Sequence, residues 1–147
     1  MGGEAANLSS STNGYAMTTT THAPIDHPSL RTPPGPWSNA ILVEPGKRYL
    51  FSCGLVGVSA EGVVPEGIEE QTRIIYRNIT TLLQQAGMTM ADVVKITTFM
   101  VDTNEQASYS AARRPFFEGV KPAITLVQVA GLVNRDYRVE VEFIAAR

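Results

Sequence analysis

Few residues in this chain are of the types that carry nucleophilic or metal chemistry. The 147 residues include one cysteine, Cys53, and two histidines, His22 and His27. One cysteine cannot form an internal disulfide or a thiolate zinc cage, and two histidines offer little for a catalytic triad or a metal site. A lone cysteine is also more often a buried, inert thiol than a nucleophile. We therefore expect no metal centre and no histidine-based triad.

A second set of chemically capable groups is a pair of carboxylates near the C-terminal end. Residues 137–145 alternate apolar and charged side chains, which is typical of a strand that buries one face. Glu140 and Glu142 then share the other face with Arg138. A carboxylate at this position can move a proton or position a water molecule, but exposed glutamates are also common on a charged strand face. Residue type and spacing leave both interpretations of Glu140 open.

The elements that must position these groups follow from periodicity and turn residues. Apolar residues recur at helical spacing over residues 68–86. A second helix is predicted over residues 105–117, where Pro115 should kink or end the last turn. The Pro45–Gly46 turn predicts that the first two strands pair as a β-hairpin. The predicted strands are residues 40–43, 49–53, 55–58, 93–101, 123–129 and 137–145.

The order β-β-(β)-α-β-α-β-β predicts an α+β fold in which two helices cover one face of a sheet. Two helices can cover only one side, so the other face must meet solvent or another subunit, and oligomerisation is expected. No apolar run approaches the ~20 residues that cross a membrane. The formal net charge of −2 lacks the basic excess that binding to a phosphate backbone needs, so nucleic acid is not an expected partner.

Residues 1–36 differ in composition from the rest of the chain. Serine and threonine supply eight of the first 21 positions, and five of the nine prolines lie between Pro24 and Pro36. Such a segment buries too little apolar surface to offset the entropy of ordering it. It also lacks the basic start and the apolar run of a secretory signal, so a cytoplasmic protein is expected. We predict a disordered or extended arm over residues 1–36 and one domain over residues 37–147.

Several short motifs, in this order, resemble the Rid/YjgF family of reactive-intermediate (enamine/imine) deaminases. The motifs are Gly35–Ala40, Ser52–Gly54, Glu69–Arg73, Asn78–Ile79, Asp92–Phe99, Lys121–Ala123 and Glu140–Ala145. Each motif is weak alone, but their order and spacing together are specific. The resemblance implies a chorismate-mutase-like β-β-α-β-α-β-β subunit and a homotrimer around a central barrel. It also implies small-molecule clefts between the subunits.

In the deaminase-active branch, the resemblance implies a reactive enamine or imine substrate that pyridoxal-phosphate enzymes release. Water attacks the imine carbon and yields a 2-keto acid and ammonia without a cofactor. This reaction needs a cation for the substrate carboxylate, a group that positions water, and a shaped cleft. The family arginine follows Pro-Ala in the penultimate strand, but this chain has Ile124 after Pro122 and Ala123. Without that arginine, the pocket is expected to favour an apolar, aromatic or neutral ligand.

The other family positions carry over one by one. The water-positioning glutamate corresponds to Glu140, so the resemblance makes Glu140 the catalytic residue. The aromatic residue after Gly-Pro, usually tyrosine, is Trp37, and the serine before glycine in the second strand is Cys53. A frequent asparagine of the second helix corresponds to Ser110. Together with Ile124, these side chains are expected to shape the substrate pocket.

The sequence leaves open both the replacement for the missing cation and the function itself. Four arginines are candidates for the cation, namely Arg113, Arg114, Arg135 and Arg138. The first functional interpretation is hydrolysis (deamination) of a non-standard imine or enamine. The alternative is a non-catalytic trimer of the same fold that binds a metabolite or a protein. A role with nucleic acid is suggested only by the ribonuclease label that some relatives carry, and it ranks last because of the net charge.

Overall fold

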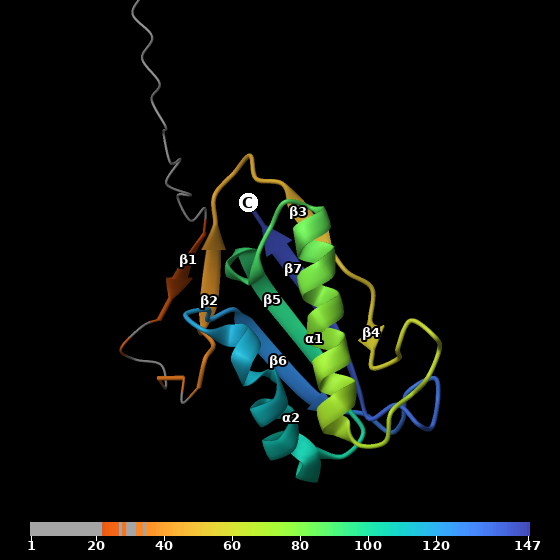
Figure 1. Ribbon diagram of the computed structural model, residues 1–147. Helices are drawn as coiled ribbons and strands as arrows, with labels where there is room; N and C mark the ends of the chain where they lie inside the picture. Colours follow the sequence, from red (N-terminus) through yellow and green to blue (C-terminus); the bar gives the residue numbers. More distant parts are fainter. Residues whose placement is uncertain (1–21, 27, 29–31, 34) are drawn as a thin grey trace, which may run out of the picture.

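The computed structural model describes residues 22–26, 28, 32–33 and 35–147, and in them two helices cover one face of a mixed sheet (Figure 1). The part of the predicted arm at residues 1–21, 27, 29–31 and 34 lies outside the described residues. The strands are β1 (His22–Ile25), β2 (Ala40–Val43), β3 (Tyr49–Phe51), β4 (Leu55–Val56), β5 (Val93–Met100), β6 (Ala123–Gln128) and β7 (Val139–Ala146). The helices are α1 (Ile68–Gln85) and α2 (Gln106–Arg113), with short 3₁₀ helices at Met90–Asp92, Thr103–Glu105 and Arg114–Phe117.

Strand β7 lies inside the five-stranded sheet, whose order is β3-β7-β5-β6 with β4 also paired to β7. It runs antiparallel to β3, β4 and β5, whereas β5 and β6 run parallel to each other. A parallel pair needs a crossover connection, which α2 supplies. The β5–β6 register aligns Ile96 with Ile124 and Thr98 with Leu126. These four side chains lie on the face of the sheet that the helices cover.

Helix α1 begins where predicted and ends one residue earlier. Ile75, Ile79 and Leu83 recur every four residues and are fully buried against the sheet. The helix stops before Gly87, whose φ of 66° is a left-handed conformation that favours glycine. Within the described residues, no helix is long and apolar enough to cross a membrane. The apolar stripe of α1 therefore serves the core of the domain.

Helix α2 is shorter than predicted because of Pro115. The α-helix ends at Arg113, and the chain continues as the 3₁₀ helix Arg114–Phe117 with proline in its first turn. Proline has no backbone N–H and its ring clashes with the preceding turn of an α-helix. The prediction that Pro115 ends the last turn is confirmed. As a result, Arg113 is the last α-helical residue, and its side chain is buried.

The predicted hairpin between β2 and β3 is wrong. The chain does turn at Pro45–Gly46, where Gly46 has a φ of 79°, but β2 pairs with β1 and β3 pairs with β7. Turn residues reverse the direction of the chain without selecting the partner of the strand that follows. Beside β7, Leu50 of β3 packs against the hydrophobic core. Strand β2, whose residues are exposed or half-buried, offers no comparable contact.

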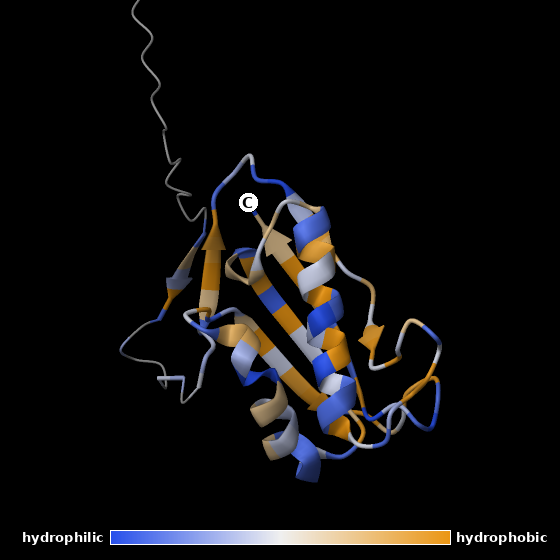
Figure 2. Cartoon of the chain, viewed as in Figure 1, coloured by the Kyte–Doolittle hydropathy of each residue, from blue (hydrophilic) through white to orange (hydrophobic). Residues whose placement is uncertain are grey.

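The two faces of the sheet differ in what they bury. On the helix-covered face, Val139, Val141 and Phe143 of β7 join the core, as the alternation predicted. Figure 2 shows this alternation of hydrophobic and hydrophilic residues along the central strands. The opposite face carries Glu140 and Glu142 of β7. It also carries three large apolar side chains that are exposed, namely Tyr49, Phe51 and Val127.

A buried hydroxyl network joins the two helices to β5. The hydroxyl of Tyr76 in α1 lies 2.9 Å from that of Tyr109 in α2, which lies 2.8 Å from Oγ1 of Thr98 in β5. All three side chains are fully buried. Burial raises the pKa of Tyr76 well above its ordinary value of 10.0, because a phenolate would lose its hydration, and Tyr109 adds to the rise. Tyr76 therefore keeps its proton at pH values where an exposed tyrosine would release it.

Replacing Tyr76 with phenylalanine is expected to weaken the alkaline loss of stability. The folded chain holds the Tyr76 proton more tightly than the unfolded chain does. The contribution of this proton to the stability of the folded chain is therefore complete below pH 10, and the free energy of unfolding falls as the pH rises above 10.0. Urea denaturation at about pH 9 and about pH 11 measures this fall. The wild-type fall persisting in Tyr76→Phe would contradict the assignment.

Candidate functional site

Three of the predicted pocket residues, Trp37, Ser110 and Ile124, line one cavity of about 240 Å³ between α2, β6 and the segment before β2. Helix spacings of four and three residues place its α2 side chains on one helix face, and strand spacing places its β6 side chains on the helix-covered face. We call it the α2–β6 cavity. Its full lining is Trp37, Gln106, Ser110, Arg113, Ile124 and Leu126.

Trp37 is held in place by its chain neighbours. Its ring lies against Gly35, where an added Cβ would come within 2.0 Å of the ring. The next residue, Ser38, is buried and donates its hydroxyl to the carbonyl of Lys121 at 2.7 Å. Its backbone N–H donates to the carbonyl of Pro122 at 3.2 Å. These bonds tie the segment to the loop that leads into β6 and so fix the aromatic wall of the cavity.

Among the described residues, Arg113 is the one charged side chain that lines this cavity, and only 7% of it is exposed. Its guanidinium carbon lies 5.2 Å from the centre of the Tyr109 ring and 4.9 Å from the centre of the Phe117 ring. Cation–π contacts of this kind hold a guanidinium against aromatic faces. Within the described part of the chain, Nη1 donates to no acceptor and no carboxylate lies within ion-pair distance.

Glu140 lies on the opposite face of the sheet. It is half-buried in β7 and pairs in register with Val56 of β4 and Phe99 of β5. Its carboxylate lies directly on Gly54, where an added Cβ would come within 1.7 Å of Oε1. Any larger residue at position 54 would occupy the space of the carboxylate. The Ser-Cys-Gly motif and the Glu-x-Glu motif therefore meet at this point.

Cys53 lies in the same segment as Gly54 and is exposed, so the expectation of a buried thiol is wrong. Its neighbour Ser52 ties the segment to β7. The Ser52 N–H donates to the carbonyl of Phe143 at 3.0 Å, and the Phe143 N–H donates to Oγ of Ser52 at 2.8 Å. Since β4 follows immediately and also pairs with β7, Cys53 lies between two segments that are bonded to β7, and its own side chain is exposed.

The five predicted site residues thus form two groups within one chain. Trp37, Ser110 and Ile124 line the α2–β6 cavity, whereas Glu140 and Cys53 are not among its lining residues. The sheet itself separates Glu140 from the cavity, because Ile124 faces the helices and Glu140 faces away from them. A molecule bound in the cavity therefore does not reach the Glu140 carboxylate of the same chain.

Of the four candidate arginines, Arg113 alone lines the α2–β6 cavity. Arg138 is engaged elsewhere, because its Nε donates to Oε2 of Glu105 at 2.9 Å and its Nη2 donates to the same oxygen. Arg114 and Arg135 are exposed. A buried arginine that packs on aromatic rings depends on tertiary packing, so residue type alone did not distinguish it from the other three.

The cavity also contains one polar residue that the sequence analysis missed. Gln106 precedes Ser110 by four residues on α2 and lines the same cavity. In a helix, residues four apart lie on the same face. That spacing was the available signal, because it brings the Gln106 amide to the cavity once Ser110 is a candidate.

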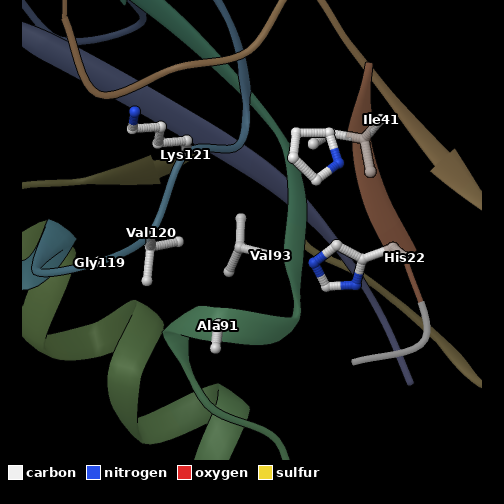
Figure 3. A pocket seen from close by; sticks show the side chains of 8 residues that line it. His22, Ile41, Ala91, Val93, Gly119, Val120 and Lys121 are labelled. Carbon is white, nitrogen blue, oxygen red and sulfur yellow. The ribbon is translucent and has the colours of Figure 1, made fainter. Parts of the chain in front are cut away.

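A second cavity of about 240 Å³ lies near the start of β5 (Figure 3). The Nδ1 atom of His22 is buried there with no partner among the described residues. In Figure 3 the amino group of Lys121 points away from the His22 ring. None of the predicted site residues lies there, so the α2–β6 cavity is the stronger candidate. The lining of the second cavity is His22, Pro24, Ile41, Ala91, Val93, Gly119, Val120 and Lys121.

The fold and the cavity define a class of small α+β subunits in which a crossover helix and an edge strand enclose room for a small molecule. A family model described as Endoribonuclease L-PSP matches residues 29–147. The chain therefore belongs to this family, which is the Rid/YjgF family. The resemblance that the sequence motifs indicated is confirmed.

Individual relatives are similar over most of their length. The chain is 36% identical to a RutC family protein of Pyrococcus abyssi, over 77% of this chain and 87% of that protein. It is 34% identical to the mouse 2-iminobutanoate/2-iminopropanoate deaminase, over 77% and 82%. Among solved structures, the Rid protein YyfB of Yersinia pestis matches with a TM-score of 0.78 and 28% identity, over 86% of this chain and 99% of that one. Escherichia coli TdcF with bound serine matches with a TM-score of 0.64 and 28% identity, over 88% and 95%.

Proposed function

We propose that this protein hydrolyses reactive imines or enamines without a cofactor and releases ammonia and a carbonyl product. The observation that carries the proposal is the α2–β6 cavity, where Trp37, Ser110 and Ile124 meet at positions that the family resemblance assigns to the substrate. The mouse relative is named as an imine deaminase, and an Escherichia coli relative as a putative reactive intermediate deaminase. Glu140, which matches the water-positioning glutamate of the family, supplies the acid–base group.

In the proposed reaction, the oxygen of a water molecule bonds to the imine carbon. Glu140 takes a proton from that water and passes a proton to the imine nitrogen, which leaves a neutral carbinolamine. The carboxylate then takes the hydroxyl proton and passes it to the amino nitrogen, the carbonyl forms as the C–N bond breaks, and neutral ammonia leaves. A positioned acid–base group of this kind contributes about 10²- to 10⁴-fold to a rate. The contact with Gly54 supports this role, because it restricts where the carboxylate lies.

The proposed site is shared between copies of the chain. The sheet lies between the α2–β6 cavity and Glu140 of the same chain, so one copy supplies the cavity and another the carboxylate. The open face of the sheet favours such contact, because it exposes Tyr49, Val127 and 68% of Phe51. We therefore propose a homotrimer with sites between its subunits, as the family resemblance implies.

The substrate is proposed to differ from the small imines named for the mammalian relatives. Ile124 takes the place of the family's carboxylate-binding arginine, and together with Leu126 and Trp37 it makes three walls of the cavity apolar. Such walls favour a larger, less polar substituent on the imine. Loss of that arginine also leaves the non-catalytic binding trimer as the second candidate, and this binder would use the same cavity.

The full chain is tested with imines generated in situ from amino acids by an amino acid oxidase, with semicarbazide as a competing trap. We expect the protein to divert imines from the trap to the free 2-keto acid. The effect should be larger for the leucine- and phenylalanine-derived imines than for 2-iminopropanoate. Trapping equal to the protein-free control for every imine would overturn the hydrolase and leave the binding trimer.

A further inference from the structure

We propose that Arg113 binds the carboxylate of the ligand in the α2–β6 cavity and so replaces the arginine that the family carries on its penultimate strand. The ligand is then a small monocarboxylate with an apolar substituent. In the proposed function, that ligand is a 2-imino acid with a branched or aromatic side chain. Only the identification of the ligand as a 2-imino acid rests on the proposed function, because Arg113 can bind a carboxylate whether or not the ligand is hydrolysed.

The first argument is the charge of Arg113 itself. The side chain is more than nine-tenths buried, and among the described residues Nη1 has no acceptor and the guanidinium has no carboxylate partner. A buried charge without a counter-charge is strongly unfavourable. Within one chain, the cavity that Arg113 lines is therefore a place where a ligand anion would be stabilised, beside the site that Glu140 of another copy is proposed to complete. Although the strand arginine is absent, Arg113 gives this pocket a cation.

The second argument is that the guanidinium is held in one place. Its carbon lies within 5.2 Å of the ring centres of both Tyr109 and Phe117. Tyr109 is fixed in turn by its hydroxyl contacts with Tyr76 and Thr98 at 2.9 and 2.8 Å. A guanidinium that meets a carboxylate edge-on binds it with two oxygens. A group that is already ordered loses little entropy when it binds.

The third argument concerns the rest of the lining. One cation suits a monoanion, and among the described residues the lining of the cavity holds no second cation for a phosphate dianion. Gln106 and Ser110 place an amide and a hydroxyl on the same helix face, where they can hydrogen-bond to a polar atom next to the carboxylate. The remaining walls are apolar. The expectation of a neutral ligand rested on Ile124 alone, and Arg113 in the same cavity favours an anionic one instead.

The test compares two probes that do not react, 4-methyl-2-oxopentanoate and its neutral carboxamide, by isothermal titration calorimetry of the full chain. We expect the wild type to bind the acid about 10- to 100-fold more tightly than the amide, since a charge-assisted pair is lost with the amide. Arg113→Met should abolish this preference, and Arg113→Lys should keep part of it. Arg114→Met removes the same charge from an exposed neighbour and should leave the preference unchanged.

Each outcome decides the assignment. If the wild type binds acid and amide equally, the proposal is overturned whatever the variants do, so it does not depend on Arg113→Met being folded. Equal losses in the Arg113 and Arg114 variants would also overturn it, because the effect would then come from overall charge. If imines are not hydrolysed but the acid preference depends on Arg113, the proposed function fails and this inference stands. If imines are hydrolysed but the wild type does not prefer the acid, the proposed function stands and this inference fails.

Discussion

Replacing Glu140 with glutamine is expected to lower the turnover of imines by about 10²- to 10⁴-fold, the range that a positioned acid–base group contributes. Glutamine keeps the shape of the side chain but cannot take a proton from water. The fold should persist, because Glu140 is half-buried on the open face of the sheet and is not part of the core. Steady-state keto acid formation by the variant measures the effect, and thermal unfolding shows that the chain is folded.

The matched control is Glu142→Gln. Glu142 lies two residues further along β7 on the same face, is exposed, and carries the same charge. We expect its turnover to stay within about twofold of the wild type, since Glu142 takes no part in the proposed proton transfers. Equal losses in the two variants would show that the charge of this face matters, and would remove Glu140 from the mechanism.

A second variant moves the carboxylate without removing it. In Gly54→Ala the new methyl group would occupy the position of Oε1 of Glu140. The glutamate side chain is able to rotate away, so we expect a folded protein with a carboxylate in the wrong place. Turnover should then fall by about 10²-fold, because misplacement of about 1 Å has that effect. Wild-type turnover in this variant would mean that the position on Gly54 is not the active one.

The largest effect on stability is expected from Gln71→Leu. The Gln71 side chain is 1% exposed, and its Nε2 donates to the carbonyls of Pro65 and Asp136 at 3.0 and 2.8 Å. Its Oε1 accepts the backbone N–H of Arg138 at 2.8 Å. Leucine would leave two carbonyls and one N–H without partners. At about 1–3 kcal/mol for each of the three unsatisfied groups, the loss is about 3–9 kcal/mol, which is a large part of the stability of a domain.

Urea denaturation at one fixed protein concentration measures the effect of Gln71→Leu. Gln84→Leu makes the same chemical change at an exposed position of α1 and should change the free energy of unfolding by less than about 0.5 kcal/mol. The space around Gln71 does not relax easily, because the backbone of Gln71 packs closely on Gly57. A Cβ added to Gly57 would lie 2.3 Å from the Cα of Gln71. A loss below about 1 kcal/mol for Gln71→Leu would contradict the role of this side chain as the tie between α1 and the loop before β7.

Local patterns predicted most of the fold. Helix α1 begins where its apolar spacing indicates, Pro115 ends α2, and Val139, Val141 and Phe143 of β7 point into the core. The pairing of β2 with β3 was wrong, because strand partners depend on which surfaces become buried far along the chain. The Pro45–Gly46 turn contains no information about β7.

The site was predictable only in part. Family motifs supplied the candidates Trp37, Ser110 and Ile124, and the structure brings these three to one cavity. Spacing on α2 would have added Gln106. The isolation of Arg113 was not predictable, because it depends on which groups surround the side chain. The contact of Glu140 with Gly54 joins two distant motifs through β4 and β7 and likewise needs the folded structure.

The position of β7 in the sheet has a consequence for how the chain folds during synthesis. Strands β3, β4 and β5 all find their antiparallel partner in β7, which follows every other strand in the sequence. As the chain emerges from the ribosome, three strand edges therefore stay unpaired until residues 139–146 are made. Unpaired edges bind other unpaired edges. The central sheet of this protein is thus expected to assemble only once β7 has been made.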